Sequence, residues 1–434
     1  MLFPRSIVIP ALLALVAMAL IGGFLVWQLD RARLFLQKTP QTQTSSGATI
    51  RTISPLPPVI NHDNSALSAL RSGDLFALRG EWTAAEKDYA RAVDAGGGIT
   101  ALRKLAQAQL QRRNIDAARE TLRTLRSAGA RDEDLVLLES IIQLRSGNNA
   151  DALRILTEAS ESPQKHYGLA LLAIINQRHD DARQSLATVI AGWEPTLRSY
   201  AKTLLAAYDE YSLFADSPES HRQTLLARAL ADIGECELAL PILATVLTTS
   251  DDYRDAWIVQ GYCQLTTERP DAAKLSLERA YAIDPQKPEI QYFLARTFSI
   301  LGDHQAAVTY LTYALENGFT PVTEAKRLLA AEAFAIGNST LALQQLDDLT
   351  RMDTATVDAF SEFVTASLSI GHTEEAYARA QAAVQLHQDS AIAHELLGWA
   401  AMETQRLDEA RAELTTALTL DPSLQSARER LDSL

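Results

Sequence analysis

The side chains that could carry out chemistry are few and form no catalytic motif. The segment HELLG, residues 394–398, begins like the helix of a zinc protease. In such a helix two histidines four residues apart hold the metal, but Gly398 stands where the second histidine is needed. The sequence also has no glycine-rich loop ahead of a Lys-Ser or Lys-Thr pair, and no Gly-x-Ser-x-Gly turn. We therefore predict that the protein is not an enzyme, holds no metal or cofactor, and has no small-molecule substrate.

The charge balance argues against nucleic acid as a partner. The 434 residues have a formal net charge of −14. The segment 1–65 carries five of the 40 basic and two of the 54 acidic side chains, which leaves 35 basic against 52 acidic side chains in the rest. A surface of this sign repels phosphate backbones. We expect no binding of nucleic acid.

An apolar segment at residues 7–27 follows a short N-terminal tail, residues 1–6. Its 21 residues contain no charge, which is enough for a helix to cross a hydrocarbon core of about 30 Å. The segment predicts a single transmembrane helix in the plasma membrane. A cleaved signal peptide, with Ala17-Met18-Ala19 as the cleavage site, is the alternative. Cleavage there would leave an apolar start, which favours the membrane helix.

Residues 28–65 are predicted to form a disordered linker, because Thr, Ser, Pro and Gln dominate residues 39–65 and leave too little apolar surface to pack. Linkers of this composition favour a periplasmic position for the domain that follows. Arg31, Arg33 and Lys38 favour the cytoplasm instead, since basic residues beside a membrane segment tend to stay inside. We expect the periplasmic side, and the cytoplasmic side stays open as the alternative.

The sequence that follows the linker repeats with a period of about 34 residues. In a frame that takes Arg254 as position 1, position 8 is small in nine of ten copies and position 15 is glycine in six. Position 20 is alanine in every copy, and the separations between successive copies are 33, 34, 30, 57, 34, 34, 35, 34 and 34. These alanines are Ala85, Ala118, Ala152, Ala182, Ala239, Ala273, Ala307, Ala342, Ala376 and Ala410.

The spacing predicts pairs of amphipathic helices. Positions 4, 7, 8 and 11 lie on one stripe of a helix, and positions 20, 24 and 27 lie on a stripe of the next. Two helices approach to roughly 8–10 Å only where small side chains line the crossing, as Gly261 and Ala273 would. A single pair cannot bury its stripe alone, so successive pairs must stack.

This pattern resembles the tetratricopeptide repeat family, in particular its membrane-anchored bacterial members. The resemblance implies repeats of two antiparallel helices, A and B, stacked into a right-handed superhelix. It covers four repeats in residues 66–196 and six in residues 220–424. An irregular inserted helix over 197–219 separates them, and residues 425–434 are expected to form a capping helix. The predicted fold is an all-α solenoid of about ten repeats, preceded by one transmembrane helix and a disordered linker.

The inserted segment carries an apolar stripe at helical spacing, and it ends at Ser217-Pro218. It is either an extra packing helix that joins the two blocks of repeats or an aromatic ridge that binds a ligand. The stripe consists of Tyr200, Leu204, Tyr208, Tyr211 and Phe214.

The two cysteines fall at the ends of neighbouring helices in this frame. Cys236 would begin one helix B and Cys263 would lie late in the next helix A, so antiparallel packing places both in the same layer. Two interpretations stay open. The cysteines form a disulfide, which requires Cα atoms within about 7 Å, or they are two separate, half-buried thiols.

The resemblance also implies a concave groove that binds a peptide, lined mainly by positions 2, 5, 9 and 12 of helix A. Thr224 and Ile258 at position 5, and the lack of Asn at position 9, depart from the clamp that holds a terminal carboxylate in some members. A strip of Arg and Tyr would instead bind an acidic peptide, unless the arginines pair with neighbouring Glu and Asp. The candidate peptide-binding residues are Arg228, Tyr262, Tyr292, Arg296 and Arg327.

These observations together predict a membrane-tethered scaffold. Such a protein would bind a protein or peptide partner in its groove and recruit it to an envelope assembly, with a high local concentration near the bilayer. The alternative is a cytoplasm-facing adaptor that regulates membrane-protein quality control or an enzyme of envelope biosynthesis.

Overall fold

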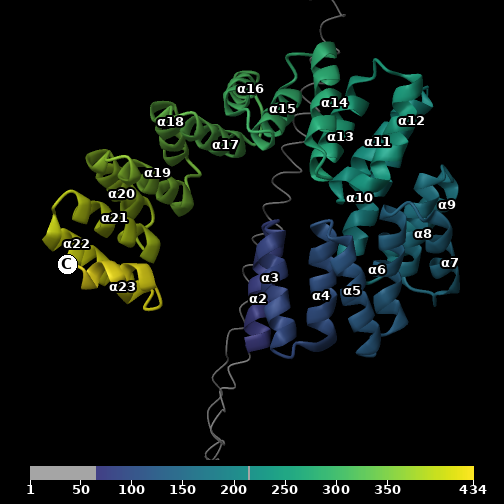
Figure 1. Ribbon diagram of the computed structural model, residues 1–434, viewed down its shortest axis with the longest axis horizontal. Helices are drawn as coiled ribbons and strands as arrows, with labels where there is room; N and C mark the ends of the chain where they lie inside the picture. The colour runs from purple at the N-terminus through teal and green to yellow at the C-terminus, as the bar shows by residue number, and fades with distance from the viewer. Residues whose placement is uncertain (1–64, 214–215) are drawn as a thin grey trace, which may run out of the picture. The chain divides into compact units, whose positions relative to one another are not determined.

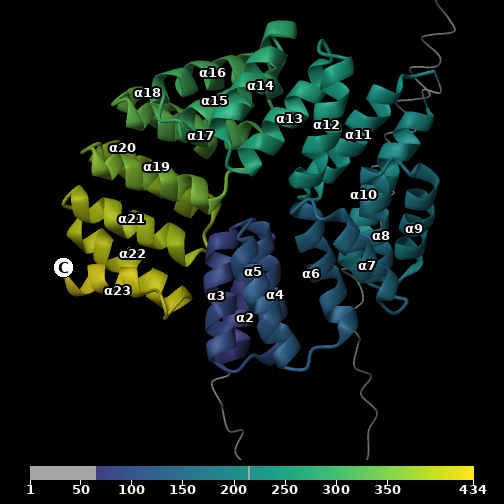
Figure 2. The same ribbon diagram turned by 45° about the vertical axis from the view of Figure 1, so that its right-hand side comes forward.

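The computed structural model describes residues 65–213 and 216–434, apart from the side chains of residues 133 and 134. All of its regular elements in these ranges are α-helices, and each helix packs on the next one along the chain. Figure 1 shows them as successive hairpins, and Figure 2 shows α19 to α23 as a stack of neighbouring helices. The described part of the chain is therefore an α-solenoid.

The described residues form 22 helices, which are ten hairpins, one extra helix between the fourth and fifth hairpins, and one final helix. The first four hairpins are α2 (Ser65–Leu78) with α3 (Trp82–Asp94), α4 (Gly98–Gln111) with α5 (Ile115–Ser127), α6 (Asp132–Arg145) with α7 (Asn149–Glu158), and α8 (Pro163–Ile175) with α9 (His179–Ala191). The extra helix is α10 (Pro195–Ser212). The other six hairpins are α11 (Glu219–Asp232) with α12 (Cys236–Thr249), α13 (Arg254–Thr266) with α14 (Pro270–Ile283), α15 (Pro288–Ile300) with α16 (His304–Glu316), α17 (Val322–Ala335) with α18 (Ser339–Thr350), α19 (Val357–Ser369) with α20 (Thr373–Leu386), and α21 (Ala391–Glu403) with α22 (Leu407–Leu420). The final helix is α23 (Gln425–Asp432).

The small residues of the repeat frame line the helix crossings, as predicted. All ten alanines at position 20 lie in the second helix of a hairpin, and each is at most 1% exposed. A Cβ atom added to Gly261 would lie 2.5 Å from Cγ of Leu277, and one added to Gly398 would lie 2.7 Å from Cγ of Leu414. Both distances are shorter than any real contact of a Cβ atom, so these two crossings admit only glycine without rearrangement.

The turn between the two helices of each hairpin depends on one residue in the left-handed conformation, at position 15. This residue is glycine in six hairpins, with φ between 75° and 85°. In the other four it is not glycine and still has a φ of 57° to 64°. The left-handed residue lets the turn amides bond back to the last carbonyls of the first helix. The four exceptions are Arg113, Gln177, Glu268 and Gln405.

Replacing Gln405 with glycine should therefore stabilise the protein. Gln405 has φ 64° and is exposed, so removal of its side chain costs no buried contacts. Relief of the left-handed strain, less the extra entropy that glycine has in the unfolded chain, should raise the free energy of unfolding by about 0.5–1 kcal/mol. Urea denaturation checks the prediction. Gly371→Ala, at the matching turn of another hairpin, should lower the free energy of unfolding. A loss of stability in Gln405→Gly would contradict the prediction.

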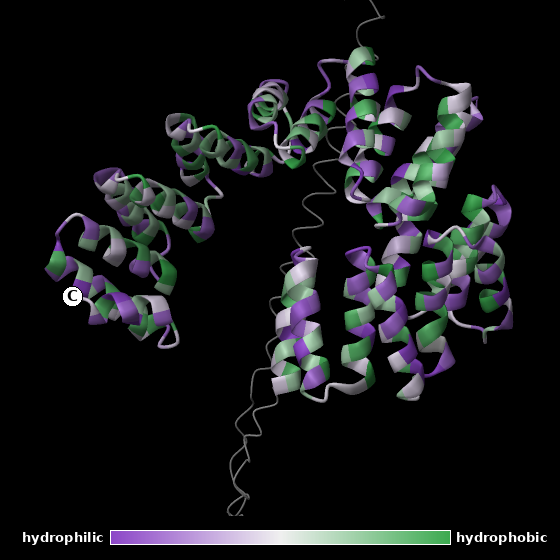
Figure 3. Cartoon of the chain, viewed as in Figure 1, coloured by the Kyte–Doolittle hydropathy of each residue, from purple (hydrophilic) through white to green (hydrophobic). Residues whose placement is uncertain are grey.

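The stacked hairpins bury their apolar stripes against one another and leave polar residues outside, so hydrophobic and hydrophilic positions alternate around most helices (Figure 3). Helix α8 is an exception, because Tyr167 and the run from Leu171 to Ile174 are all at most 2% exposed. A helix that is apolar on every side must be enclosed. Helices α6, α9 and α10 pack around it.

The extra helix α10 overlaps the segment 197–219 for which an inserted helix was predicted, but it begins at Pro195 and ends at Ser212, and Glu219 already begins α11. Leu204 is fully buried and Tyr208 is 3% exposed, and the partly buried Tyr200 and Tyr211 pack against the same core. The stripe therefore faces the protein interior rather than forming a free aromatic ridge. Phe214, the last member of the predicted stripe, lies outside the described residues.

The predicted fold class needs one correction. The transmembrane helix expected over residues 7–27 and nearly all of the expected linker lie outside the described residues. Within residues 65–213 and 216–434, no helix is long and apolar enough to cross a membrane. The physical reason is composition, since even the 18-residue α10 carries Arg198, Lys202, Asp209 and Glu210. The fold that the structure supports is the helical solenoid of residues 65–213 and 216–434.

Candidate functional site

A pocket of about 480 Å³ lies between the first helices of three successive hairpins. Helix α11 contributes residues from its C-terminal end, α13 contributes residues between Asp255 and Tyr262, and α15 contributes its N-terminal end together with Lys287, which precedes it. Helices α11 and α13 touch directly, as do α13 and α15, because the second helices of these hairpins lie on the other face of the stack. The lining residues are Arg228, Ala231, Asp232, Asp255, Ile258, Val259, Tyr262, Lys287, Glu289 and Phe293.

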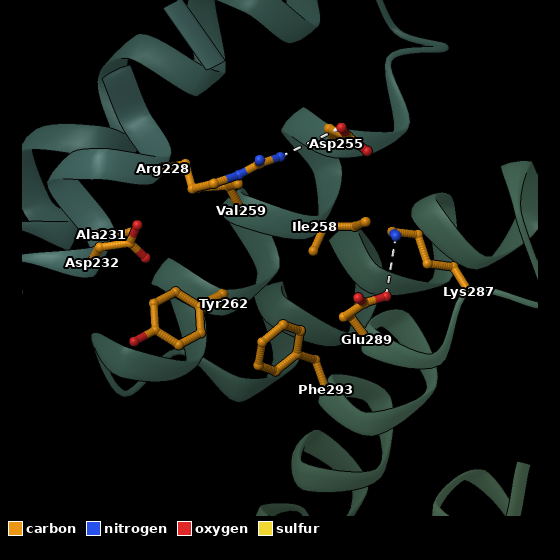
Figure 4. A pocket seen from close by; sticks show the side chains of 10 residues that line it. All are labelled: Arg228, Ala231, Asp232, Asp255, Ile258, Val259, Tyr262, Lys287, Glu289 and Phe293. Atoms are coloured by element: carbon orange, nitrogen blue, oxygen red, sulfur yellow. Dashed lines mark hydrogen bonds and ion pairs between the residues drawn. The ribbon is translucent and has the colours of Figure 1, made fainter. Parts of the chain in front are cut away.

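The pocket has an aromatic side and a charged rim (Figure 4). The rings of Tyr262 and Phe293 lie next to each other, with centroids 5.4 Å apart and planes tilted by 53°. Ile258 and Val259 add aliphatic surface from α13. Such a mixture of apolar surface with a few charged groups is typical of a site that binds a side chain of a partner.

Two of the predicted peptide-binding residues, Arg228 and Tyr262, line this pocket, and three do not. Tyr292 is only 3% exposed, because it stacks on Phe319 with ring centroids 4.1 Å apart. Its hydroxyl donates a hydrogen bond of 2.5 Å to Glu324. Tyr292 is thus a packing residue between hairpins rather than a groove residue.

The arginines of the predicted strip are mostly held by neighbouring side chains. Nη2 of Arg228 lies 3.4 Å from Oδ2 of Asp255. Nε of Arg327 lies 2.9 Å from Oε2 of Glu362 on the next first helix, and Arg296 lies 5.9 Å from the ring centre of Tyr292. Local pairing, the alternative to a strip that binds an acidic peptide, is therefore what the structure shows for Arg228 and Arg327.

Several pocket residues were missed from the sequence. Asp255 and Glu289 occupy position 2 of helix A, which the repeat frame marks as a groove position, so a search of that position for acids would have found them. Asp232 and Phe293 stand at positions 13 and 6, outside the set of groove positions. Only the packing of the helices brings these two side chains to the pocket.

Asp232 differs from the other charged residues of the pocket. Asp255 is paired with both Arg228 and Arg254, and Lys287 lies 3.2 Å from Glu289. Asp232 has no hydrogen bond or ion pair with any side chain in the described ranges. The side chain of Asp232 is exposed, and partial desolvation by its neighbours raises the pKa of its carboxyl group, which the nearby positive charge of Arg228 only partly offsets.

The turn that follows Asp232 is anchored by a buried ion pair from a distant part of the solenoid. Nε of Arg145, at the end of α6, lies 2.8 Å from Oε2 of Glu235, and the two side chains are 2% and 5% exposed. Arg145 also donates hydrogen bonds to Oε1 of Glu235 at 3.0 Å and to the carbonyl oxygen of Leu110 at 2.6 Å. Burial disfavours the charged guanidinium, but the charge of Glu235 outweighs it and raises the pKa of Arg145.

A second arginine strengthens the same anchor. Arg113, in the turn between α4 and α5, donates to the carbonyl oxygen of Gly234 at 3.1 Å and lies 3.4 Å from Oε1 of Glu237. Arg113 and Arg145, which lie at the C-terminal ends of α4 and α6, therefore bind the start of α12, about 90 to 120 residues further along the chain.

The two cysteines lie beside this anchor. Both are free thiols in the structure and both are fully buried, with Cys236 at the start of α12 and Cys263 near the end of α13. A hydrogen bond between them lowers the pKa of Cys236, whereas burial raises the pKa of Cys263. They are neighbours, as the repeat frame indicated, and their pairing as a disulfide stays a prediction.

The histidine of the HELLG segment has a structural role. Nδ1 of His394 lies 2.6 Å from Oε2 of Glu413, and Nε2 lies 2.9 Å from the carbonyl oxygen of Gln388, so both ring nitrogens are engaged. Throughout the ranges that the structure describes, no three His, Cys, Asp or Glu side chains are grouped so as to hold a metal ion.

Comparison with known proteins gives one family match. The sequence model of the tetratricopeptide repeat family matches residues 103–165, 224–288 and 362–424. These segments run from within α4 to the start of α8, from within α11 to the start of α15, and from within α19 to the end of α22, so the second match contains most of the pocket. No curated protein sequence matches the chain.

Solved structures are similar to the chain at low sequence identity. YrrB, described as a TPR protein with an unusual peptide-binding site, is 15% identical over 44% of this chain and 98% of its own, with a TM-score of 0.37. Yeast Tom70 is 13% identical over 86% of this chain and 88% of its own, with a TM-score of 0.32. A thermophilic TPR protein of Thermus thermophilus is 16% identical over 48% of this chain and 100% of its own, with a TM-score of 0.31.

Proposed function

The chain is a tetratricopeptide-repeat protein, and we propose on this basis that it is a non-enzymatic scaffold that binds a peptide segment of a partner protein in the pocket between α11, α13 and α15. The observation that carries the proposal is the pocket itself, a concave site of about 480 Å³ on three successive first helices. It combines a pair of aromatic rings with charged groups around them. Aromatic anchors in a pocket with a polar rim are the usual source of affinity in protein interfaces.

Peptide selection on the full-length chain tests the proposal. A displayed library of random decapeptides is panned against the protein, and the peptides that it enriches are measured by fluorescence polarisation. Enrichment of a defined sequence supports a peptide site if the same peptide, free and unlabelled in solution, displaces the bound one. Panning that returns no sequence above background contradicts the proposal.

Tyr262→Ala should weaken binding of the selected peptide by at least about tenfold, because a central aromatic anchor contributes strongly to an interface. Tyr313→Ala is the matched control, since Tyr313 is 42% exposed on α16 and does not line the pocket. It should bind the peptide as tightly as the parent protein. Equal affinities for Tyr262→Ala and the parent would place the peptide elsewhere on the solenoid.

The cellular position is a second part of the proposal. We propose that the solenoid acts at a bacterial cell envelope, outside the plasma membrane, and recruits its partner to an envelope assembly. The Thr, Ser, Pro and Gln composition of residues 39–65 favours this side. Protease added to cells opened only at the outer barrier should digest the solenoid. Protection until the plasma membrane is breached would instead favour the cytoplasm-facing adaptor.

A further inference from the structure

One carboxylate of the pocket, that of Asp232, has no partner among the residues that the structure describes. Arg228 is engaged by Asp255 and Lys287 by Glu289, whereas Asp232 has no hydrogen bond or ion pair with the side chains that the structure describes. In Figure 4 Asp232 lies on the same side of the pocket as Tyr262. A ligand that enters the pocket therefore meets an acidic group that is not yet neutralised.

The position of Asp232 is unfavourable for the folded protein by itself. Asp232 is the last residue of α11, where the helix dipole is negative and disfavours a carboxylate. Its side chain is exposed, and the partial desolvation that its neighbours impose still disfavours the charge and raises its pKa. Residues whose position lowers the stability of the fold tend to occur at functional sites. A cation supplied by a partner would remove both penalties.

The surface around Asp232 also suits a cation with an apolar stem. The rings of Tyr262 and Phe293 line the pocket, and a guanidinium or ammonium group placed over the face of such a ring gains cation–π energy. Ile258 and Val259 can cover the methylene groups of a lysine or arginine. The lining as a whole has three carboxylates against two cations, so it attracts positive charge.

The charge of the whole solenoid acts in the same direction. Since the segment 1–65 holds only five of the 40 basic and two of the 54 acidic side chains, 35 basic side chains stand against 52 acidic ones in the rest of the chain. A field of this sign speeds the encounter with a positively charged segment and slows the encounter with an acidic one.

We propose that the pocket binds a basic side chain, a lysine or arginine of the partner peptide, with its charged group paired to Asp232 and its stem lying over Tyr262 and Phe293. The inference rests on the proposed peptide-binding function and specifies its ligand. It replaces the acidic peptide expected from the arginines alone, because Arg228 already has a carboxylate partner within the pocket.

Panning of the same decapeptide library separates this inference from the proposed function. The parent protein should enrich peptides with a lysine or arginine at one fixed position. Asp232→Asn should lose that preference, while Asp353→Asn, which changes an exposed aspartate outside the pocket, should keep it. Enrichment of neutral or acidic peptides would overturn the inference and leave peptide binding intact. If the parent enriches nothing, the proposed function fails as well.

A double-mutant cycle then assigns the contact. In the selected peptide the basic residue is replaced by glutamine. This change should weaken binding to the parent and to Asp353→Asn by about 10–100-fold, because a charge-assisted pair is lost. On Asp232→Asn the same change should matter less than about twofold. An equal loss on both proteins would show that the basic residue does not pair with Asp232.

Asp232→Asn is expected to fold, which keeps the test interpretable. The pKa of Asp232 is raised in the folded state, so ionisation of this group costs stability once the pH exceeds the pKa of the unfolded chain. Removal of the charge should leave the melting temperature at pH 7 equal or higher. A lower melting temperature would mean that the carboxylate stabilises the fold, and Asp232 would then be a structural residue rather than a ligand-binding one.

Discussion

Arg145→Ala is expected to lower the free energy of unfolding by about 3–5 kcal/mol, because it leaves the buried Glu235 as an uncompensated charge. Glu235 is about 4% exposed and receives two bonds from the guanidinium of Arg145, at 2.8 Å and 3.0 Å. The carbonyl oxygen of Leu110 loses one of its donors as well and keeps the backbone N–H of Arg113. Urea denaturation of the full-length chain, followed by far-UV circular dichroism, measures the loss.

Two variants make this expectation specific to the buried pair. Arg327→Ala breaks an ion pair whose side chains are 42% and 37% exposed, so it should cost no more than about 1 kcal/mol. The double substitution Arg145→Met with Glu235→Leu removes both charges and keeps apolar volume, so it should be more stable than Arg145→Ala. A cost for Arg145→Ala as small as that for Arg327→Ala would show that the anchor does not hold the fold together.

The anchor also has a consequence for the candidate site. Arg145 and Arg113 bind the turn from Gly234 to Glu237, which directly follows the end of α11 and Asp232. Loss of the anchor should therefore weaken peptide binding even under conditions in which the protein is still folded. Comparison of peptide affinity with the circular dichroism of Arg145→Ala in water checks this.

Leu277→Ala is expected to destabilise the protein by about 2–5 kcal/mol, because it opens a cavity at the crossing of α13 and α14. Leu277 is fully buried, and its side chain fills the space above Gly261. Gly261→Ala is expected to cost about 1–3 kcal/mol through overpacking, despite the better helix propensity of alanine, since the new methyl group meets Leu277 at 2.5 Å.

The double variant Gly261→Ala with Leu277→Ala gives the sharper test. The added methyl group enters the space that the removed leucine atoms vacate, so the double variant should lose clearly less stability than the sum of the two single variants. Melting temperatures and urea denaturation of the four proteins complete the cycle. Additive losses would show that Gly261 and Leu277 do not share one packed crossing.

The repeat frame is the part of the fold that could be predicted well. Position 20 of each copy is buried in a second helix, and position 8 lies in the first helix of the same hairpin. The turn at position 15 is left-handed in all ten hairpins, including the four that have no glycine there. Repeats of this kind are held together by contacts between neighbouring helices, so a local pattern carries most of the information.

The candidate site could be predicted only in part. The frame selected Arg228 and Tyr262, which line the pocket, and it also selected Tyr292, which is buried against Phe319. Ile258 and Tyr292 both stand at position 5, yet Ile258 lines the pocket and Tyr292 packs on Phe319, because what packs beside a side chain decides which way it turns. The sequence offered no means to see that Arg228 is already paired.

The helical hairpins and their small-residue crossings follow from residues close together in the chain, and the acidic character follows from composition, so all three could be predicted from the sequence. The pairing of charges could not, because it depends on how distant helices pack in three dimensions. The pair of Arg145 and Glu235 joins residues 90 apart, and the pocket joins Asp232 to Phe293 across three helices. Such contacts depend on how successive hairpins rotate against one another, and no spacing within one repeat encodes that rotation.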